Sequence, residues 1–251
     1  MFRAAVFALA TCLLSTQAAS AFDIENMSPE ERAAFGREVR AYLLENPRVF
    51  LEIVALIEEQ RANEAAQAEL NLVRDNYDAI FDDGFSYVGG NPDGDITVVE
   101  FLDYRCGFCK RAFPAVEELI ESDGNIRIIV KEYPILGEGS ILASRYAIAT
   151  LKVEGDEAYK TVHDRLMTLR GEPSDFALQR LSEELGHDHD EIAKLMNSEE
   201  VSGIIEANYA LARTLQIQGT PTFVMGDALI RGFVDLNQMR VIVADQRRIR
   251  G

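Results

Sequence analysis

The amino-acid sequence predicts an α/β protein that is preceded by a helical N-terminal arm. Residues 96–130 read as a strand, a helix and a second strand, which together make a βαβ unit. Residues 222–230 read as a β-hairpin, and residues 140–217, between these two parts, read almost wholly as helices. We therefore expect an α/β protein with a helical region between its βαβ unit and its hairpin.

The composition of the chain excludes several classes of protein. With 42 acidic against 25 basic side chains, the 251-residue sequence has a net charge of −17. That charge argues against a nucleic-acid partner, because nucleic-acid binding needs a basic surface. A hydrophobic fraction of 47% is ordinary for a globular protein and excludes wholesale disorder. Three cysteines are too few for a disulfide-dense scaffold.

Residues 1–21 read as a cleaved secretory signal peptide. Arg3 precedes a short apolar run, and Ala19-Ser20-Ala21 fits the small-residue rule for cleavage. The run is too short to span a bilayer. The alternatives are a buried helix and a lipid anchor on Cys12, which is disfavoured because apolar residues continue beyond it. We expect an exported protein, periplasmic in a bacterial cell, that retains two cysteines after cleavage.

Residues 22–82 form the predicted helical arm. Ser28-Pro29-Glu30-Glu31 supplies a capping box with a proline at the first helical position, and this helix runs to Asn46-Pro47. Residues 48–80 contain no glycine or proline and repeat apolar residues every three to four positions, which predicts a second helix about 50 Å long. Its narrow apolar stripe needs cover, either from the protein's own core or, as we favour, from other copies in a homo-oligomer.

The elements of the α/β core follow from local patterns. Residues 96–102 are mostly apolar and β-branched, which is typical of a strand buried on both faces. A dense turn signal at 89–94 precedes this strand. The full set comprises strands at 85–88, 96–102, 126–130, 222–225 and 228–230, and helices at 106–121 and about 235–248.

The motif Cys106-Gly107-Phe108-Cys109 carries the chemistry. It opens a helix, where unpaired N–H groups favour a thiolate on the first sulfur. We expect Cys106 to be the exposed nucleophile that forms a mixed disulfide with a client, and Cys109 to be the inward thiol that resolves it. Because the pair follows a buried strand inside a βαβ unit, it predicts a thiol–disulfide oxidoreductase.

Three other interpretations of the cysteine pair remain open. A zinc site needs four ligands, and only His187 and His189 are candidates to complete it, although we expect these as surface loop and helix-cap residues. A purely structural disulfide is the second interpretation. The third is a copper-binding or holdase module, but the nearest downstream methionine is Met167, with Met225 beyond it. We predict neither a metal nor a cofactor.

The segment 99–110, VEFLDYRCGFCK, resembles the active site of DsbA-like thioredoxin-fold oxidoreductases, notably the suppressor-of-copper-sensitivity C and Com1-like branch. Pro114 resembles the helix-kinking proline of that fold, and the segment 219–223, GTPTF, resembles the loop whose cis proline faces the CxxC. The resemblance covers residues 85–248. It implies a thioredoxin fold with an inserted helical domain and an N-terminal arm. The implied domains are a signal peptide at 1–21, an arm at 22–82, a thioredoxin-like domain at 83–139 and 218–251, and an inserted helical domain at 140–217.

The resemblance also assigns roles to individual residues. Pro221 in cis would leave the backbone before it free to pair with an extended substrate, with an ordinary trans proline as the alternative. Glu100 matches the buried acid of the family, which would relay the proton of Cys109; a partly exposed strand glutamate is the alternative. Lys110 either adds positive potential or is merely solvated. The residues expected to contact substrate are Gly107, Phe108, Thr220 and Pro221.

The Gly-Phe dipeptide and Thr220 indicate the direction of exchange. DsbA-type oxidases usually have valine before the cis proline and a histidine in the dipeptide, whereas this sequence is more similar to the oligomeric periplasmic isomerases. We therefore favour an oligomeric exported disulfide isomerase or shuffling enzyme over a monomeric disulfide-introducing oxidase. The clients would be exported proteins with cysteines. The membrane redox partner would be a reductant for an isomerase and an oxidant for an oxidase.

Overall fold

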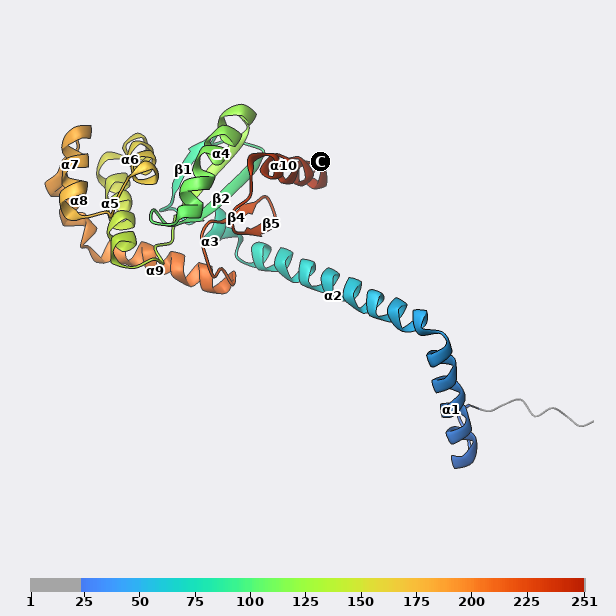
Figure 1. Cartoon of the computed structure of the whole chain (residues 1–251). Helices are drawn as coiled ribbons and strands as arrows, with labels where there is room; N and C mark the ends of the chain where they lie inside the picture. The colour runs from blue at the N-terminus through green and yellow to red at the C-terminus, as the bar shows by residue number, and fades with distance from the viewer. Residues whose placement is uncertain (1–23, 251) are drawn as a thin grey trace, which may run out of the picture. The chain divides into compact units, whose positions relative to one another are not determined.

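The computed structural model describes residues 24–250, so the predicted signal peptide lies outside the described residues. The chain divides into two compact units, one up to Arg61 and one from Ala62 onward (Figure 1). Within residues 24–250, no helix combines the length and the apolar character needed to cross a membrane.

The first unit is made of helix α1 (Pro29–Glu45) and the start of helix α2 (Pro47–Asp75). The predicted capping box is present, since Ser28 Oγ accepts from the Glu31 N–H and the Glu31 carboxylate accepts from the Ser28 N–H. The break between the helices falls at Asn46, as predicted. Large apolar side chains of this unit are exposed, namely Phe35, Val39, Tyr42, Leu43, Leu44, Phe50, Leu51, Ile53, Leu56 and Ile57.

The prediction of one continuous helix over residues 48–80 is wrong. Helix α2 ends at Asp75, and a short helix α3 (Tyr77–Phe81) follows. At the break, the Asn76 side chain donates a hydrogen bond to the Leu72 carbonyl at 2.8 Å, and so competes with the backbone of the next turn. The break allows Ile80 and Phe81 to be buried in a hydrophobic cluster with β-sheet residues. This end of the predicted arm therefore belongs to the core of the second unit.

A mixed five-stranded sheet with the order β1-β3-β2-β4-β5 forms the centre of the second unit. Its strands are β1 (Tyr87–Gly90), β2 (Ile96–Leu102), β3 (Ile126–Glu132), β4 (Thr222–Met225) and β5 (Ala228–Arg231). Strands β2 and β3 are parallel and the other pairs are antiparallel, which confirms the βαβ unit and the hairpin. Because β2 is central, Val98 and Leu102 join one hydrophobic cluster, while Val99 and Phe101 join the other.

Helices cover both faces of this sheet. Helix α4 (Gly107–Asp123) links β2 to β3 and packs with α10 (Leu236–Arg250) on the face of Val98 and Leu102. The predicted helical block lies between β3 and β4 and, as Figure 1 shows, α5 to α8 group together beside the sheet. Its members are α5 (Glu138–Glu154), α6 (Asp156–Thr168), α7 (Asp175–Leu185), α8 (His189–Met196) and α9 (Glu199–Thr214). Since side chains alternate along β2, Glu100 shares the α4 face with Val98 and Leu102.

Candidate active site

The two motifs singled out in the sequence meet where β2 ends and α4 begins. Cys106 is the N-cap residue of α4, and Cys109 lies in the first turn of that helix. The peptide bond between Thr220 and Pro221, just before β4, is cis. In its thiol form Cys106 Sγ donates to the carbonyl oxygen of Thr220 at 3.1 Å, although the two residues are 114 positions apart. Pairing of β2 with β4 brings the two loops together.

Both cysteines are free thiols and both are buried. Cys106 is only 7% exposed, so the expectation of an exposed nucleophile is wrong. The sulfur is covered because the loop before β4 lies over it, at the contact with Thr220. Cys109 is fully buried, whereas Phe108 between the cysteines is 57% exposed. The surface of the motif is therefore formed by an aromatic ring and Gly107, with the reactive sulfur beneath.

The electrostatics of the pair separate the two sulfurs. The Cys109 thiol donates to Cys106 Sγ, and this hydrogen bond is the main cause that lowers the pKa of Cys106 to about 5, against the opposing effect of desolvation. The side chain of Thr220 and the backbone N–H groups of Cys109 and Phe108 also lower it, as expected at a helix N-terminus. The same hydrogen bond, together with burial, raises the pKa of Cys109. Cys106 is thus a thiolate at neutral pH, and Cys109 is a thiol.

Glu100 is a buried acid on the central strand. It is 2% exposed, and its Oε1 has no hydrogen-bond partner among the described residues. Burial is the largest of the causes that raise the pKa of Glu100 to about 8, and the negative groups Glu117, Cys106 and Glu132 add to it. A carboxyl group with this pKa can hold or release a proton near neutral pH. The negative charge of ionised Glu100 also raises the pKa of the Cys109 thiol.

Two cations beside the motif are held by the helical block. Arg105 donates to both carboxylate oxygens of Glu172, at 2.6 and 2.7 Å, and also to the Leu136 carbonyl. Lys110 Nζ donates to the Leu169 carbonyl at 2.7 Å. Lys110 therefore links α4 to the loop between α6 and α7. Neither interpretation from the sequence, added positive potential or a solvated lysine, predicts this contact.

A buried polar network behind the motif was missed by the sequence analysis. The Glu132 carboxylate accepts hydrogen bonds from the hydroxyl groups of Tyr104, Tyr159 and Ser144, at 2.7 to 2.8 Å. His163 Nδ1 lies 3.1 Å from the Tyr104 hydroxyl. This network joins the strand end before Cys106 to α5 and α6. The sequence offered one local sign of this network, the position of Tyr104 within the segment 99–110. Its hydrogen-bond partners lie up to 59 residues away, so local patterns could not identify them.

Asp103 is a second anchor that the sequence analysis missed. Its carboxylate accepts from the backbone N–H groups of Arg105, Ile135 and Leu136, and from the Ser140 hydroxyl at 2.8 Å. The side chain therefore fixes the loop before Cys106 against the loop that follows β3. This aspartate is fully buried, and its partners satisfy the charge.

The two remaining histidines do not reach the cysteine pair. Asp188 caps α8, and His189 Nδ1 lies 3.1 Å from Ser182 Oγ. His187 Nδ1 is buried without a hydrogen-bond partner in the described part of the chain. Across residues 24–250, no group of three or more His, Cys, Asp or Glu side chains is placed to hold a metal ion.

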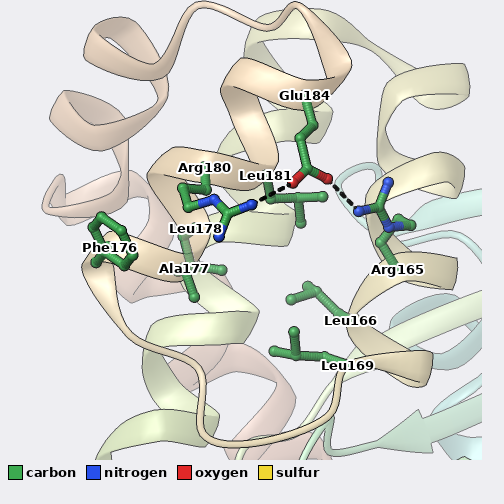
Figure 2. Close-up of a pocket in the computed structure, with 9 residues that line it drawn as sticks. All are labelled: Arg165, Leu166, Leu169, Phe176, Ala177, Leu178, Arg180, Leu181 and Glu184. Atoms are coloured by element: carbon green, nitrogen blue, oxygen red, sulfur yellow. Dashed lines mark hydrogen bonds and ion pairs between the residues drawn. The ribbon is translucent and has the colours of Figure 1, made fainter.

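A separate cavity of about 220 Å³ lies between α6 and α7 (Figure 2). Leucines line it, and Arg165 and Arg180 both pair with Glu184 at its rim. The cavity contains no cysteine. The Cys106–Cys109 pair lies instead where β2, α4 and the cis-proline loop meet.

Two family models match the chain. Residues 97–244, more than half of the sequence, match the DSBA-like thioredoxin domain. Residues 31–64 match the N-terminal domain of the copper resistance protein ScsC. The second match falls within the residues predicted as the helical arm.

Solved structures give the same pattern. A thioredoxin-like oxidoreductase from Silicibacter pomeroyi DSS-3 is 40% identical, with 68% of this chain and 97% of that chain covered and a TM-score of 0.64. The thiol-disulfide exchange protein alpha-DsbA2 from Wolbachia pipientis is 30% identical, with 71% of this chain and 96% of that chain covered and a TM-score of 0.66. A linker-deletion mutant of Proteus mirabilis ScsC is 26% identical, with 88% of this chain and 97% of that chain covered and a TM-score of 0.67.

The first curated relatives are much longer proteins. They are Na⁺/H⁺ antiporters of Salinispora tropica and Salinispora arenicola, 29% identical over 137 residues and 27% identical over 158 residues. The chain spans only 21% and 24% of their lengths.

Proposed function

The chain belongs to the DSBA-like thioredoxin-domain family, whose members are thiol–disulfide oxidoreductases, and from this premise we propose that it exchanges disulfides in protein clients through Cys106 and Cys109. The observation that carries the proposal is the lowered pKa of the Cys106 sulfur at the N-terminus of α4. A thiolate is the nucleophile of disulfide exchange, so this sulfur is ready to react at neutral pH.

The exchange proceeds in two displacements. The Cys106 thiolate attacks one sulfur of a client disulfide, and the other client sulfur leaves as a thiolate. The Cys109 thiol then passes its proton to the ionised form of Glu100 and attacks Cys106, which releases the second client thiolate. Two electrons have moved from the cysteine pair to the client, and a Cys106–Cys109 disulfide remains. Glu100 is buried on the sheet face that α4 covers, and Cys109 is buried in the first turn of α4. The raised pKa values of these two groups support proton transfer from the thiol to the carboxylate.

Isomerisation is the direction that we favour. A cysteine of the client attacks the mixed disulfide in place of Cys109, and Cys106 leaves as a thiolate, with no net change in oxidation state. The cycle begins from reduced enzyme. The low pKa of Cys106 stabilises this form in either direction of exchange, so the preference for isomerisation rests on Gly107-Phe108 and Thr220. A disulfide-introducing oxidase uses the same groups in reverse and is the alternative. Refolding of a scrambled disulfide protein and oxidation of a reduced peptide, measured side by side, distinguish the two.

Client contact is assigned to the surface around the sulfur. The exposed ring of Phe108, the adjacent Gly107, and the loop of Thr220 and Pro221 surround Cys106, and we assign the client to this surface. Replacement of Cys109 by serine should leave the mixed disulfide unresolved. Client proteins should then stay covalently bound to Cys106, whereas a Cys106→Ser variant should capture none. Absence of captured clients with the Cys109→Ser variant would contradict the proposed exchange.

Self-association through the arm is part of the proposal. The apolar side chains of α1 and the start of α2 are exposed in the single chain, and burying them between copies is favourable. The double variant Ile53→Glu and Leu56→Glu should reduce the mass in solution to that of one chain and lower isomerase activity. An unchanged mass would refute self-association through this surface. Deletion up to residue 80 is unsuitable, because Val73 and Ile80 belong to the core.

A further similar structure supports a proposal for the cellular setting. A periplasmic thioredoxin-like protein from Salmonella enterica is 29% identical over 68% of this chain, and we propose that this protein is also periplasmic. Its clients would be exported proteins with cysteines. A membrane reductant would keep the pair reduced for isomerisation, and a membrane oxidant would serve the oxidase alternative.

A further inference from the structure

Three cationic side chains lie beside the CGFC motif, and they differ in their partners. Arg105 and Lys110 are held by acceptors of the helical block. Arg111 is exposed, and within the described residues it forms contacts with aromatic rings but no hydrogen bond or ion pair. The positive charge of Arg111 is therefore available to a molecule that docks at the motif.

Two phenyl rings hold the Arg111 guanidinium in place. Its Cζ lies 4.0 Å from the ring centroid of Phe233 and 5.5 Å from that of Phe108. Contact with ring faces leaves the N–H donors at the edge of a guanidinium free to bind a carboxylate in a bidentate manner. Because the rings restrict the side chain before binding, less entropy is lost when a carboxylate docks.

Among the described residues, no carboxylate forms an ion pair with Arg111. Asp235 follows Phe233 closely, but its carboxylate accepts from the Gln238 N–H at 2.9 Å and so caps the start of α10. Beside the guanidinium lies the ring of Phe108, which is 57% exposed and offers apolar surface. An apolar side chain therefore fits beside the guanidinium.

We propose that Arg111 selects clients in which a carboxylate side chain lies within one or two residues of the reactive cysteine, next to an apolar side chain. The inference rests on the proposed function, because it concerns the client of the same site. A chain with a net charge of −17 repels acidic segments at long range, so their acceptance needs a local cation. Arg111 provides this cation beside the exposed ring of Phe108.

Two synthetic peptides test the inference. Each contains one internal disulfide and one leucine beside it, and they differ only in glutamate or glutamine next to the first cysteine. The full-length reduced protein is mixed with each peptide, and the rate of peptide reduction is compared between wild type and Arg111→Gln. The ratio of the two glutamate-to-glutamine rate ratios removes long-range repulsion, because this is nearly the same for wild type and variant. It also removes any general change in thiolate reactivity, because such a change affects the two peptides alike.

We expect the glutamate-to-glutamine rate ratio of the wild type to be about three times that of Arg111→Gln at 20 mM salt. At 0.5 M salt the two ratios should become nearly equal, as for an exposed charge pair. Arg111→Lys should keep part of the preference, and Arg111→Glu should reverse it. The matched control Arg180→Gln, an exposed arginine of α7 (Figure 2), should behave as wild type. Equal ratios for the two proteins at the lower salt concentration would refute the inference alone. Failure of the wild type to reduce either peptide would refute the proposed function and the inference with it.

Discussion

Glu100 should make the folding stability of this protein fall as the pH rises. Its pKa is about 8 in the folded protein and 4.5 ordinarily, so between these values the folded state holds a proton that the unfolded state releases. The proton on Glu100 contributes fully to the free energy of unfolding below pH 4.5. This contribution is lost at about 1.4 kcal/mol per pH unit up to about pH 8. Over the two units from pH 5 to pH 7 the loss is about 3 kcal/mol. Glu100→Gln removes this loss, because an amide does not titrate.

Urea unfolding at pH 5, 6, 7 and 8 measures the effect. Cys106 titrates with the opposite sign, since its pKa is lowered, so the comparison is made between Cys106→Ser and the double variant Cys106→Ser with Glu100→Gln. The free energy of unfolding of the double variant should rise relative to the single variant by up to about 3 kcal/mol between pH 5 and pH 7, because burial, the largest cause of the raised Glu100 pKa, remains without the Cys106 charge. The exposed Glu206→Gln is the control and should give a flat difference. A flat difference for Glu100→Gln would refute the assignment of a raised pKa.

Three further predictions concern other groups. Alkylation of reduced protein by iodoacetamide should reach half its maximal rate near pH 5, the pKa of Cys106, and a midpoint near pH 8.5 would contradict the thiolate. Lys131→Met should cost about 3 kcal/mol in urea unfolding, because it leaves the partly buried Asp83 carboxylate without its ion pair to the fully buried Lys131, and adding Asp83→Asn should recover most of that loss. Arg247→Ala should cost about 1 kcal/mol by the same measurement, since its guanidinium joins α10 to two aspartates, and an unchanged midpoint would show that these ion pairs contribute nothing.

Local patterns predicted the elements near the site closely. The strand at 96–102 was predicted at its observed bounds, because a β-branched run between turn residues has few alternatives. The helix predicted from Cys106 was found through the spacing of its apolar residues. The observed helix begins at Gly107, with Cys106 as its N-cap, and continues to Asp123. The helix break at Asn76 was missed, since no glycine or proline marks it and the gain comes from burying Ile80 and Phe81 against residues far along the chain.

The linear order of residues was enough to identify the βαβ unit, the CxxC pair at a helix start and the proline motif that resembles a known family. These features depend on spacing and on backbone preferences, which are properties of short segments. The burial of Cys106 and the Glu132 network could not be read from it, whereas the resemblance already implied a buried acid at Glu100. The burial and the network depend on solvent exclusion and on hydrogen bonds between segments as far apart as Cys106 and Thr220. Folding brings those segments together, and the chemistry of the pair arises from that proximity.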